Sequence, residues 1–302
     1  MDRRQVTGLA FAFAAFASWG LLSPVSKRLL DDFEPLGANA VRFALATLLL
    51  LPWLGRTGLR DAVRLLRRRE VLWFNLLANV SLTLFLFSLV RLEPTFSTLG
   101  FYSAPLWTAL LAAVVLKERM GPWFAPAAAG LLAGGYLTLF GPHLPGPGFE
   151  SFGMALALGS AVIWAWYAVE LRRHAPSIPL KPLMGANFLF GTAWYYGLAV
   201  ALEGWPNLMD QSAQTWGWVA VHVAFPTLAS FILFNAALQR APAGPVNILI
   251  AMELAFTVLF SWLLFGEDFT TWQLAGLGLA LASVSGYLWS QWKRTKPAPD
   301  SA

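Results

Sequence analysis

The 302-residue chain contains no cysteine, which excludes disulfides, thiolate metal sites and cysteine nucleophiles. Charged residues are also scarce, at 12% of the chain, whereas soluble globular domains carry about 25%. The three histidines are scattered at positions 143, 174 and 222. Because metal and cofactor chemistry needs clustered ligands, we expect neither a metal nor a cofactor, and the composition excludes a soluble domain.

Apolar residues, by contrast, make up 57% of the chain. They occur in blocks of about 18–23 residues, the helix length that crosses a bilayer. We expect an all-α, multi-pass protein of a bacterial-type inner membrane, with residues 296–302 as a disordered tail. The blocks predict ten spans, at 6–27, 36–55, 71–90, 95–116, 123–141, 152–171, 183–202, 216–238, 244–265 and 272–292.

Positive charges indicate how the spans are oriented. The connector from Arg56 to Arg69 holds six arginines, and Lys or Arg recur after spans 4, 6 and 8 and at both termini. The connector 143–151 has none. Because Lys and Arg concentrate on the cytoplasmic side, we expect both termini in the cytoplasm. The net charge of +5 therefore orients the chain and does not predict a nucleic-acid partner.

The chain contains an internal repeat. Glu118, with Trp123 five residues later, recurs 149 positions on as Glu267 with Trp272. Spans 1 and 6 align at an offset of 145, which pairs Trp19 with Trp164. Internal repeats of this kind are frequent in transporters.

The repeat predicts an inverted architecture. Each half has five spans, an odd number, so the second half enters the membrane from the opposite side. We expect repeat 1 at 1–148 and repeat 2 at 149–295. Glu118 and Glu267 then lie at opposite membrane faces, where a gating or helix-end role suits them.

Three ionisable residues lie well inside spans, away from the span ends, where such residues are costly and mark functional sites. Glu253 is a candidate for proton coupling or for a cationic substrate group; a protonated acid bonded to a neighbouring helix is the alternative. Arg42 suits a substrate carboxylate or a structural ion pair. His222, one turn before Pro226, suits a proton relay or a buried hydrogen bond.

Further candidate substrate-binding residues are polar or aromatic. Lys27 is shallow enough to reach the surface instead, and Asn79 belongs to a stripe that could equally hold helices together. The deep aromatic residues could line an amphipathic cavity or pack against helices and lipid. They are Trp19, Tyr102, Trp164 and Tyr167.

Several short motifs carry a family resemblance. They are Trp19-Gly20 followed by Lys27, Pro35 with Arg42-Phe43, Pro105 with Lys117-Glu118, and Gly266-Glu267 with Trp272-Gln273 and Gly276. Over residues 6–292 the chain resembles the EamA family of the drug/metabolite transporter superfamily. The resemblance implies a ten-helix inner-membrane carrier of small metabolites, commonly amino acids or toxic amphipathic compounds, usually outward. Leu254 departs from the pattern, since it stands where the first half has Pro105.

We therefore expect a secondary transporter that exports its substrate by alternating access around a midplane cavity. Arg42 and Glu253 would suit a zwitterion, a proton is a candidate coupling ion, and the protein is expected to be a monomer or homodimer. A non-transporting receptor or scaffold would instead be a solid bundle. An intramembrane lipid-modifying enzyme is disfavoured because neither Gly-x-Ser-x-Gly nor His-Glu-x-x-His occurs.

Overall fold

The described residues of the computed structural model are 3–92, 97, 100–118, 121–143, 150–206, 208, 210–266 and 268–294, and their secondary structure is helical throughout. The first half contains α1 (Arg3–Trp19), α2 (Leu22–Leu29), α3 (Pro35–Leu65), α4 (Arg69–Arg91), α6 (Ala104–Leu111), η1 (Ala112–Leu116) and α7 (Phe124–Phe140). The second half contains α8 (Ser151–His174), η2 (Ala175–Ser177), α9 (Leu180–Leu202), α10 (Ala213–His222), η3 (Val223–Ala229), α11 (Ser230–Leu238), α12 (Ala243–Ile248), α13 (Ala251–Phe265) and α14 (Thr271–Arg294).

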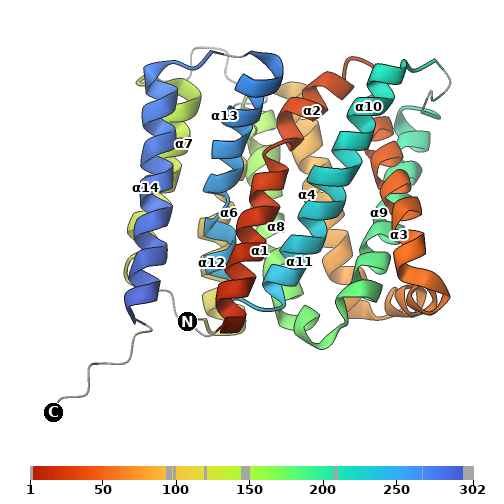
Figure 1. The fold of residues 1–302 in the computed structure, drawn as a ribbon, viewed down its shortest axis with the longest axis horizontal. Coiled ribbons are helices and arrows are strands. Elements are labelled where there is room, and N and C mark those ends of the chain that lie inside the picture. Colours follow the sequence, from red (N-terminus) through yellow and green to blue (C-terminus); the bar gives the residue numbers. More distant parts are fainter. Residues whose placement is uncertain are drawn as a thin grey trace.

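The helices have the lengths and compositions of membrane spans. Six helical stretches of the described chain are long and apolar enough to cross a bilayer, and two shorter apolar helices accompany them, at Ala104–Leu116 and Phe124–Thr138. The elements follow one another in the predicted order, upright and side by side (Figure 1). The predicted all-helical fold of two five-span halves is confirmed.

The two halves enter from opposite faces. Arg4, at the start of α1, donates a hydrogen bond to the Gln239 carbonyl, and Gln239 in turn donates to the Ala175 carbonyl after α8. The first helix of the first half therefore begins on the face where the first helix of the second half ends. The first residues of α1 and the last residues of α14 lie at this face (Figure 1).

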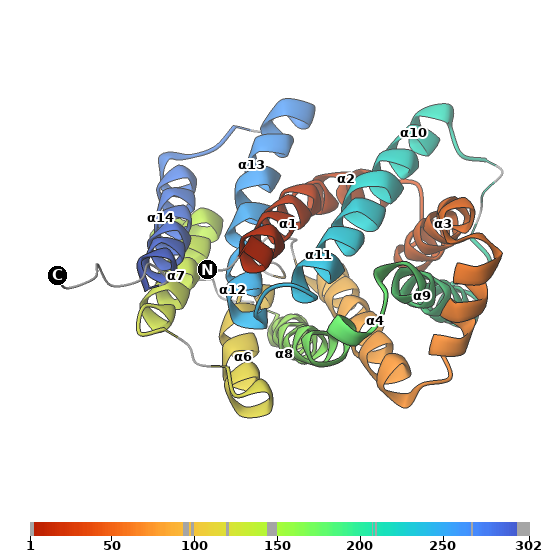
Figure 2. The same ribbon diagram turned by 60° about the horizontal axis from the view of Figure 1, so that its bottom comes forward.

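Helix packing follows the two-fold relation between the halves. The equivalent helices α3 and α9 pack together, as do α7 and α14 at the far edge of the bundle (Figure 2). The other pairs exchange partners: α4 packs on α8, and its equivalent α11 packs on α1. A two-fold axis maps the α3–α9 contact and the α7–α14 contact each onto itself. It maps the α4–α8 contact onto the α11–α1 contact, as observed.

Glycines at equivalent positions lie at two of these contacts. A Cβ on Gly8 would lie 2.8 Å from the Cβ of Ala241, and a Cβ on Gly153 would lie 2.7 Å from the Cγ of Leu92. Small residues let helix backbones come this close in a membrane. The α1–α11 and α8–α4 contacts therefore rest on the same residue type at matched sites.

Several predicted spans are broken or extended. Span 1 divides into α1 and α2 around Gly20, whose backbone packs against Phe256 of α13. The predicted end of span 2 at residue 55 marks a kink, since Gly55 has φ of 61° and the helix then continues to Leu65. Part of predicted span 4 and the predicted tail 296–302 lie outside the described residues.

Candidate functional site

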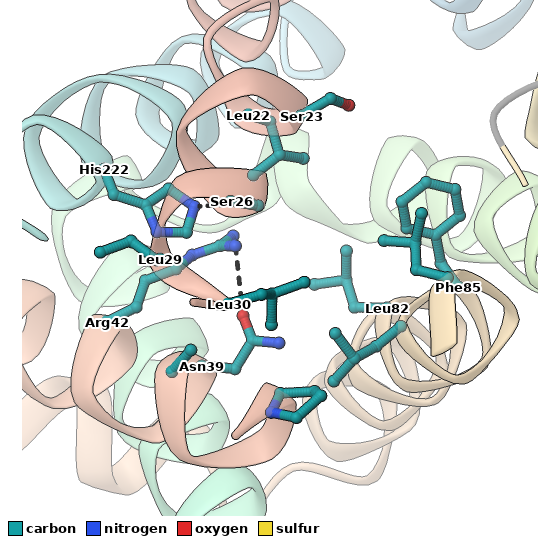
Figure 3. A pocket seen from close by; sticks show the side chains of 14 residues that line it. Leu22, Ser23, Ser26, Leu29, Leu30, Asn39, Arg42, Leu82, Phe85 and His222 are labelled. Carbon is teal, nitrogen blue, oxygen red and sulfur yellow. Dashed lines mark hydrogen bonds between the residues drawn. The ribbon is translucent and has the colours of Figure 1, made fainter. Parts of the chain in front are cut away.

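A cavity of about 190 Å³ lies mainly within the first half, at the face of the bundle where α2 ends, and His222 is the one described lining residue from the second half. Its walls come from α2, the first turns of α3 and the second half of α4, and His222 closes one side (Figure 3). Leu22, Leu29, Leu82 and Phe85 make most of the lining apolar. The polar groups are few, which is the usual make-up of a small-molecule site.

Arg42 is the one charged residue among the described lining residues. Its side chain is only 5% exposed. Nη1 donates a hydrogen bond to Oδ1 of Asn39 at 3.2 Å, while Nε and Nη2 have no partner among the described residues. The guanidinium lies over the Phe43 ring, 5.3 Å from its centroid. The fork of free N–H groups suits a carboxylate.

His222 lies on the same side of the cavity as Arg42 and is the last residue of α10 (Figure 3). Its Nε2 lies 3.4 Å from Oγ of Ser26 in α2, and Nδ1 has no partner in the described part of the chain. The ring therefore has one nitrogen engaged across the interface between the halves. The other can exchange a proton with a ligand or water.

A π-helical turn, η3, positions His222. Pro226 lacks the N–H that would bond the His222 carbonyl four residues earlier. The Thr227 hydroxyl donates to that carbonyl instead, at 2.7 Å, and Ser230 donates to the Phe225 carbonyl at 3.0 Å. The segment around Pro226 is thus a π turn that side-chain hydroxyls stabilise beside the cavity.

The aromatic residues predicted to wall the cavity pack against one another. Trp19 meets Trp164 with ring centroids 5.7 Å apart, and Phe234 contacts both rings. Trp19 and Trp164 are buried, as is Tyr102, and the residues described as lining the Arg42 cavity include none of the three. In this conformation they form a closed aromatic core where the halves meet.

The remaining predicted site residues lie elsewhere. Asn79 and Tyr167 line a second, smaller cavity deeper in the bundle. Glu253 lies in the first turn of α13, near Tyr102, and it is not among the described lining residues of either cavity. The structure thus brings Arg42 together with His222 and Asn39, and leaves Glu253 apart.

Glu118 sits at the terminus-side end of its span, beyond η1. Its carboxylate accepts the Ala243 N–H at 3.4 Å and lies 3.8 Å from Nε of Arg172. One residue of the first half thus joins α8 and the start of α12, both in the second half. Two predicted candidates fall outside what is described: residue Glu267, and the side chain of Lys27.

Sequence reasoning did not single out Asn39 or Asn187 as site residues. The signal for Asn39 was present, because it precedes Arg42 by three residues and such pairs share a helix face. Asn187 contacts a partner far along the chain, Asn235. Such a contact depends on helix packing, so local spacing does not reveal it.

Comparison with known proteins gives relatives whose names describe membrane proteins or transporters. Inner membrane protein YtfF of Escherichia coli is 26% identical over 93% of this chain and 94% of its own length. Threonine/homoserine exporter RhtA of Escherichia coli is 25% identical over 83% of this chain and 80% of its own. Human solute carrier family 35 member G1 is 29% identical, over 63% of this chain and about half, 54%, of its own length.

A solved structure and a family model also match this chain. A crystal structure of a protein 19% identical in sequence superimposes with a TM-score of 0.79, covering 96% of this chain and 99% of that one. The model of the EamA-like transporter family matches residues 6–140 and again residues 151–289. The chain is a multi-pass membrane transporter, not an enzyme, and it belongs to the EamA-like transporter family.

Proposed function

We propose that this protein is a secondary active exporter of small metabolites that carry a carboxylate, with zwitterionic amino acids as the leading class. The observation that carries the proposal is Arg42, a buried cation with two unpartnered nitrogens inside a cavity. A substrate carboxylate would satisfy this fork. The leucines and Phe85 of the walls would hold the apolar part of the substrate.

The relatives support the substrate class. RhtA is named as an exporter of threonine and homoserine, both amino acids with a carboxylate and an ammonium group. An amphipathic compound bearing a carboxylate would fit the same cavity, because its lining is mostly apolar.

We infer that repeat 1 (1–148) and repeat 2 (149–295) rock against each other to give alternating access. With both termini in the cytoplasm, the cavity of this conformation faces outward. Glu118 would hold the opposite side closed through Ala243 and Arg172. A Glu267 contact would close the outer side in the other state.

Protons are the proposed coupling ion. His222 lines the cavity that holds Arg42, so a proton on its ring would meet the substrate directly. Glu253 would act at a second position along the path, since it lies beside Tyr102 and away from Arg42. The two residues would then carry the proton at different stages of the cycle.

The test is counterflow of L-amino acids in liposomes containing the purified protein, with and without an imposed pH gradient. Arg42→Gln should lower transport at least about tenfold, since one charge-assisted hydrogen bond is worth about that factor. Arg64→Gln, which removes an exposed arginine paired with Asp61, is the matched control. Full counterflow by Arg42→Gln contradicts the assigned site, and gradient-driven transport that survives both His222→Gln and Glu253→Gln contradicts proton coupling.

A further inference from the structure

A second cavity, of about 10 Å³, adjoins the Arg42 cavity. Leu82 lines both cavities, so a single side chain forms part of the wall between them. Phe43, the neighbour of Arg42 in α3, lines the smaller one. A volume of this size holds one group as large as a water molecule.

Three oxygen atoms at this cavity have no hydrogen-bond partner among the described residues. They are Oδ1 of Asn79, Oδ1 of Asn187 and the hydroxyl of Tyr167, and each side chain is at most 7% exposed. Buried polar atoms are nearly always paired in native proteins. Three of them around one small cavity therefore point to a ligand group that bonds them.

The hydrogen bonds around the cavity determine what it offers. Nδ2 of Asn79 donates to the Asn75 carbonyl at 2.8 Å, and Nδ2 of Asn187 donates to Oδ1 of Asn235 at 3.3 Å. Each amide nitrogen thus has an acceptor for one of its two N–H groups, whereas neither amide oxygen has a donor among the described residues. The Tyr167 hydroxyl lies near Asn235 but outside hydrogen-bond geometry. The site therefore presents acceptors to a ligand rich in N–H donors.

The apolar part of the lining suits a positive charge. Phe43, Phe188 and Phe231 line the cavity beside the amide oxygens. Aromatic faces attract cations, most strongly where water is excluded. The described lining residues include no carboxylate, so the aromatic faces and carbonyl dipoles would supply the stabilisation.

We propose that Asn79, Asn187 and Tyr167 form a subsite for the ammonium group of a zwitterionic ligand whose carboxylate Arg42 holds. This inference rests on the proposed function and adds the second recognition element. An ammonium has three N–H donors, one for each unpartnered oxygen. Movement of Leu82 joins the two cavities and admits the group.

The two-fold relation connects residues that line the two cavities. Asn187 is the equivalent of Asn39, at an offset of 148, and Phe231 is the equivalent of Leu82, at 149. Asn39 and Leu82 line the Arg42 cavity, and their equivalents Asn187 and Phe231 line the smaller cavity. The described residues that line the smaller cavity include no equivalent of Arg42, since Phe190 stands at the equivalent position.

The experiment measures binding of each of the twenty L-amino acids, and of the N-trimethyl derivative of each one that binds, to the purified full-length protein. Trimethylation keeps the positive charge and removes every N–H donor. For wild type, it should weaken binding about tenfold or more, the factor that one charge-assisted hydrogen bond supplies. In Asn187→Leu and in Asn79→Leu the ratio of the two affinities should fall towards one.

Asn39→Leu is the matched control, because Asn39 is equivalent to Asn187 but lies in the Arg42 cavity. It should weaken both compounds equally and keep the wild-type ratio. The ratio is read within one preparation, so a partly unfolded variant does not mimic the expected result. If Arg42→Gln abolishes binding while Asn187→Leu and Asn79→Leu keep the wild-type ratio, the ammonium subsite is wrong and the proposed function stands. If wild type binds no amino acid, the proposed substrate class itself is wrong.

Discussion

Trp19 and Trp164 stand at equivalent positions in the two halves and meet edge to face, with ring centroids 5.7 Å apart and ring planes at 76°. Phe234 packs on both, at 5.2 and 5.4 Å. The two-fold relation thus brings a residue into contact with its own counterpart. Any movement of one half against the other has to change this contact.

The Trp19–Trp164 pair should contribute measurably to stability. In a double-mutant cycle of Trp19→Leu and Trp164→Leu, we expect a coupling of about 0.5–1.5 kcal/mol in the free energy of unfolding, the value of a well-placed aromatic pair. The measurement is denaturant unfolding of the purified protein in detergent micelles.

The control is a second tryptophan pair of the same geometry on the bundle surface. Trp73 and Trp166 meet with centroids 5.6 Å apart at 82°, and they are 39% and 41% exposed. Because their rings are partly exposed and contact the surroundings, their coupling should be smaller. Equal coupling in the two pairs would show that burial at the junction adds nothing.

The contact of α7 with α14 should depend on one glycine face. A Cβ on Gly276 would overlap the backbone of Thr138 and Gly134, whereas a Cβ on Gly278 would meet nothing within 4 Å. Gly276→Ala should lower the free energy of unfolding by about 1–3 kcal/mol, the cost of overpacking. Gly278→Ala, on the same helix, should be neutral or stabilise by up to about 1 kcal/mol through helix propensity. Thermal unfolding of both variants decides the point, and a neutral Gly276→Ala would contradict the close approach.

Glu118 should make stability depend on pH. Burial raises the pKa of its carboxyl above the ordinary value, and the Ala243 N–H and Arg172 offset this only in part. The folded state therefore holds the proton more tightly than the unfolded state. The stabilisation is fully present below the unfolded pKa and is lost as pH rises through the folded pKa.

The measurement is the melting temperature of wild type and Glu118→Gln across pH 4 to 8. The amide of Gln keeps an oxygen for the Ala243 N–H but does not titrate, so the melting temperature of the variant should gain on that of wild type as pH rises. Other groups titrate in both proteins and cancel in this difference. A difference that is constant with pH, or that shrinks as pH rises, would refute the assignment.

The proposed orientation can be tested by single cysteines, because the chain has none of its own. Ala213, at the start of α10, and Arg60, in the extension of α3, are both exposed and lie at opposite faces of the bundle. In intact cells, a membrane-impermeant maleimide should label Ala213→Cys at once and Arg60→Cys only after permeabilisation. The reverse order would place both termini outside.

Much of the fold could be predicted because the bilayer acts locally. Each span must be apolar over its own length and must satisfy its backbone within itself, so the ten blocks are visible in the chain. The breaks were less visible. The division at Gly20 depends on the approach of Phe256 from α13, and the π turn in η3 depends on which hydroxyl replaces the donor that Pro226 lacks.

The candidate site divides in the same way. Arg42 and His222 were identified as lone polar residues in apolar spans, and the structure places both in one cavity. Glu253 was identified by the same rule, yet α13 holds it away from Arg42. Asn187 was not predicted as a site residue, because its place at the small cavity depends on Asn79 and Tyr167, which belong to other helices.

By itself the sequence determined the membrane-spanning helices, the two inverted halves and the family, because hydrophobic length, residue spacing and motif order are properties of the linear chain. Only the tertiary structure decided which polar residues share a cavity, that Trp19 and Trp164 close on each other, and which amide oxygens lack partners. Those relations depend on helix rotation and on the two-fold packing of the halves. Contacts between side chains far apart in the chain determine the helix rotation and the packing of the halves. No local sequence pattern therefore predicts which residues meet.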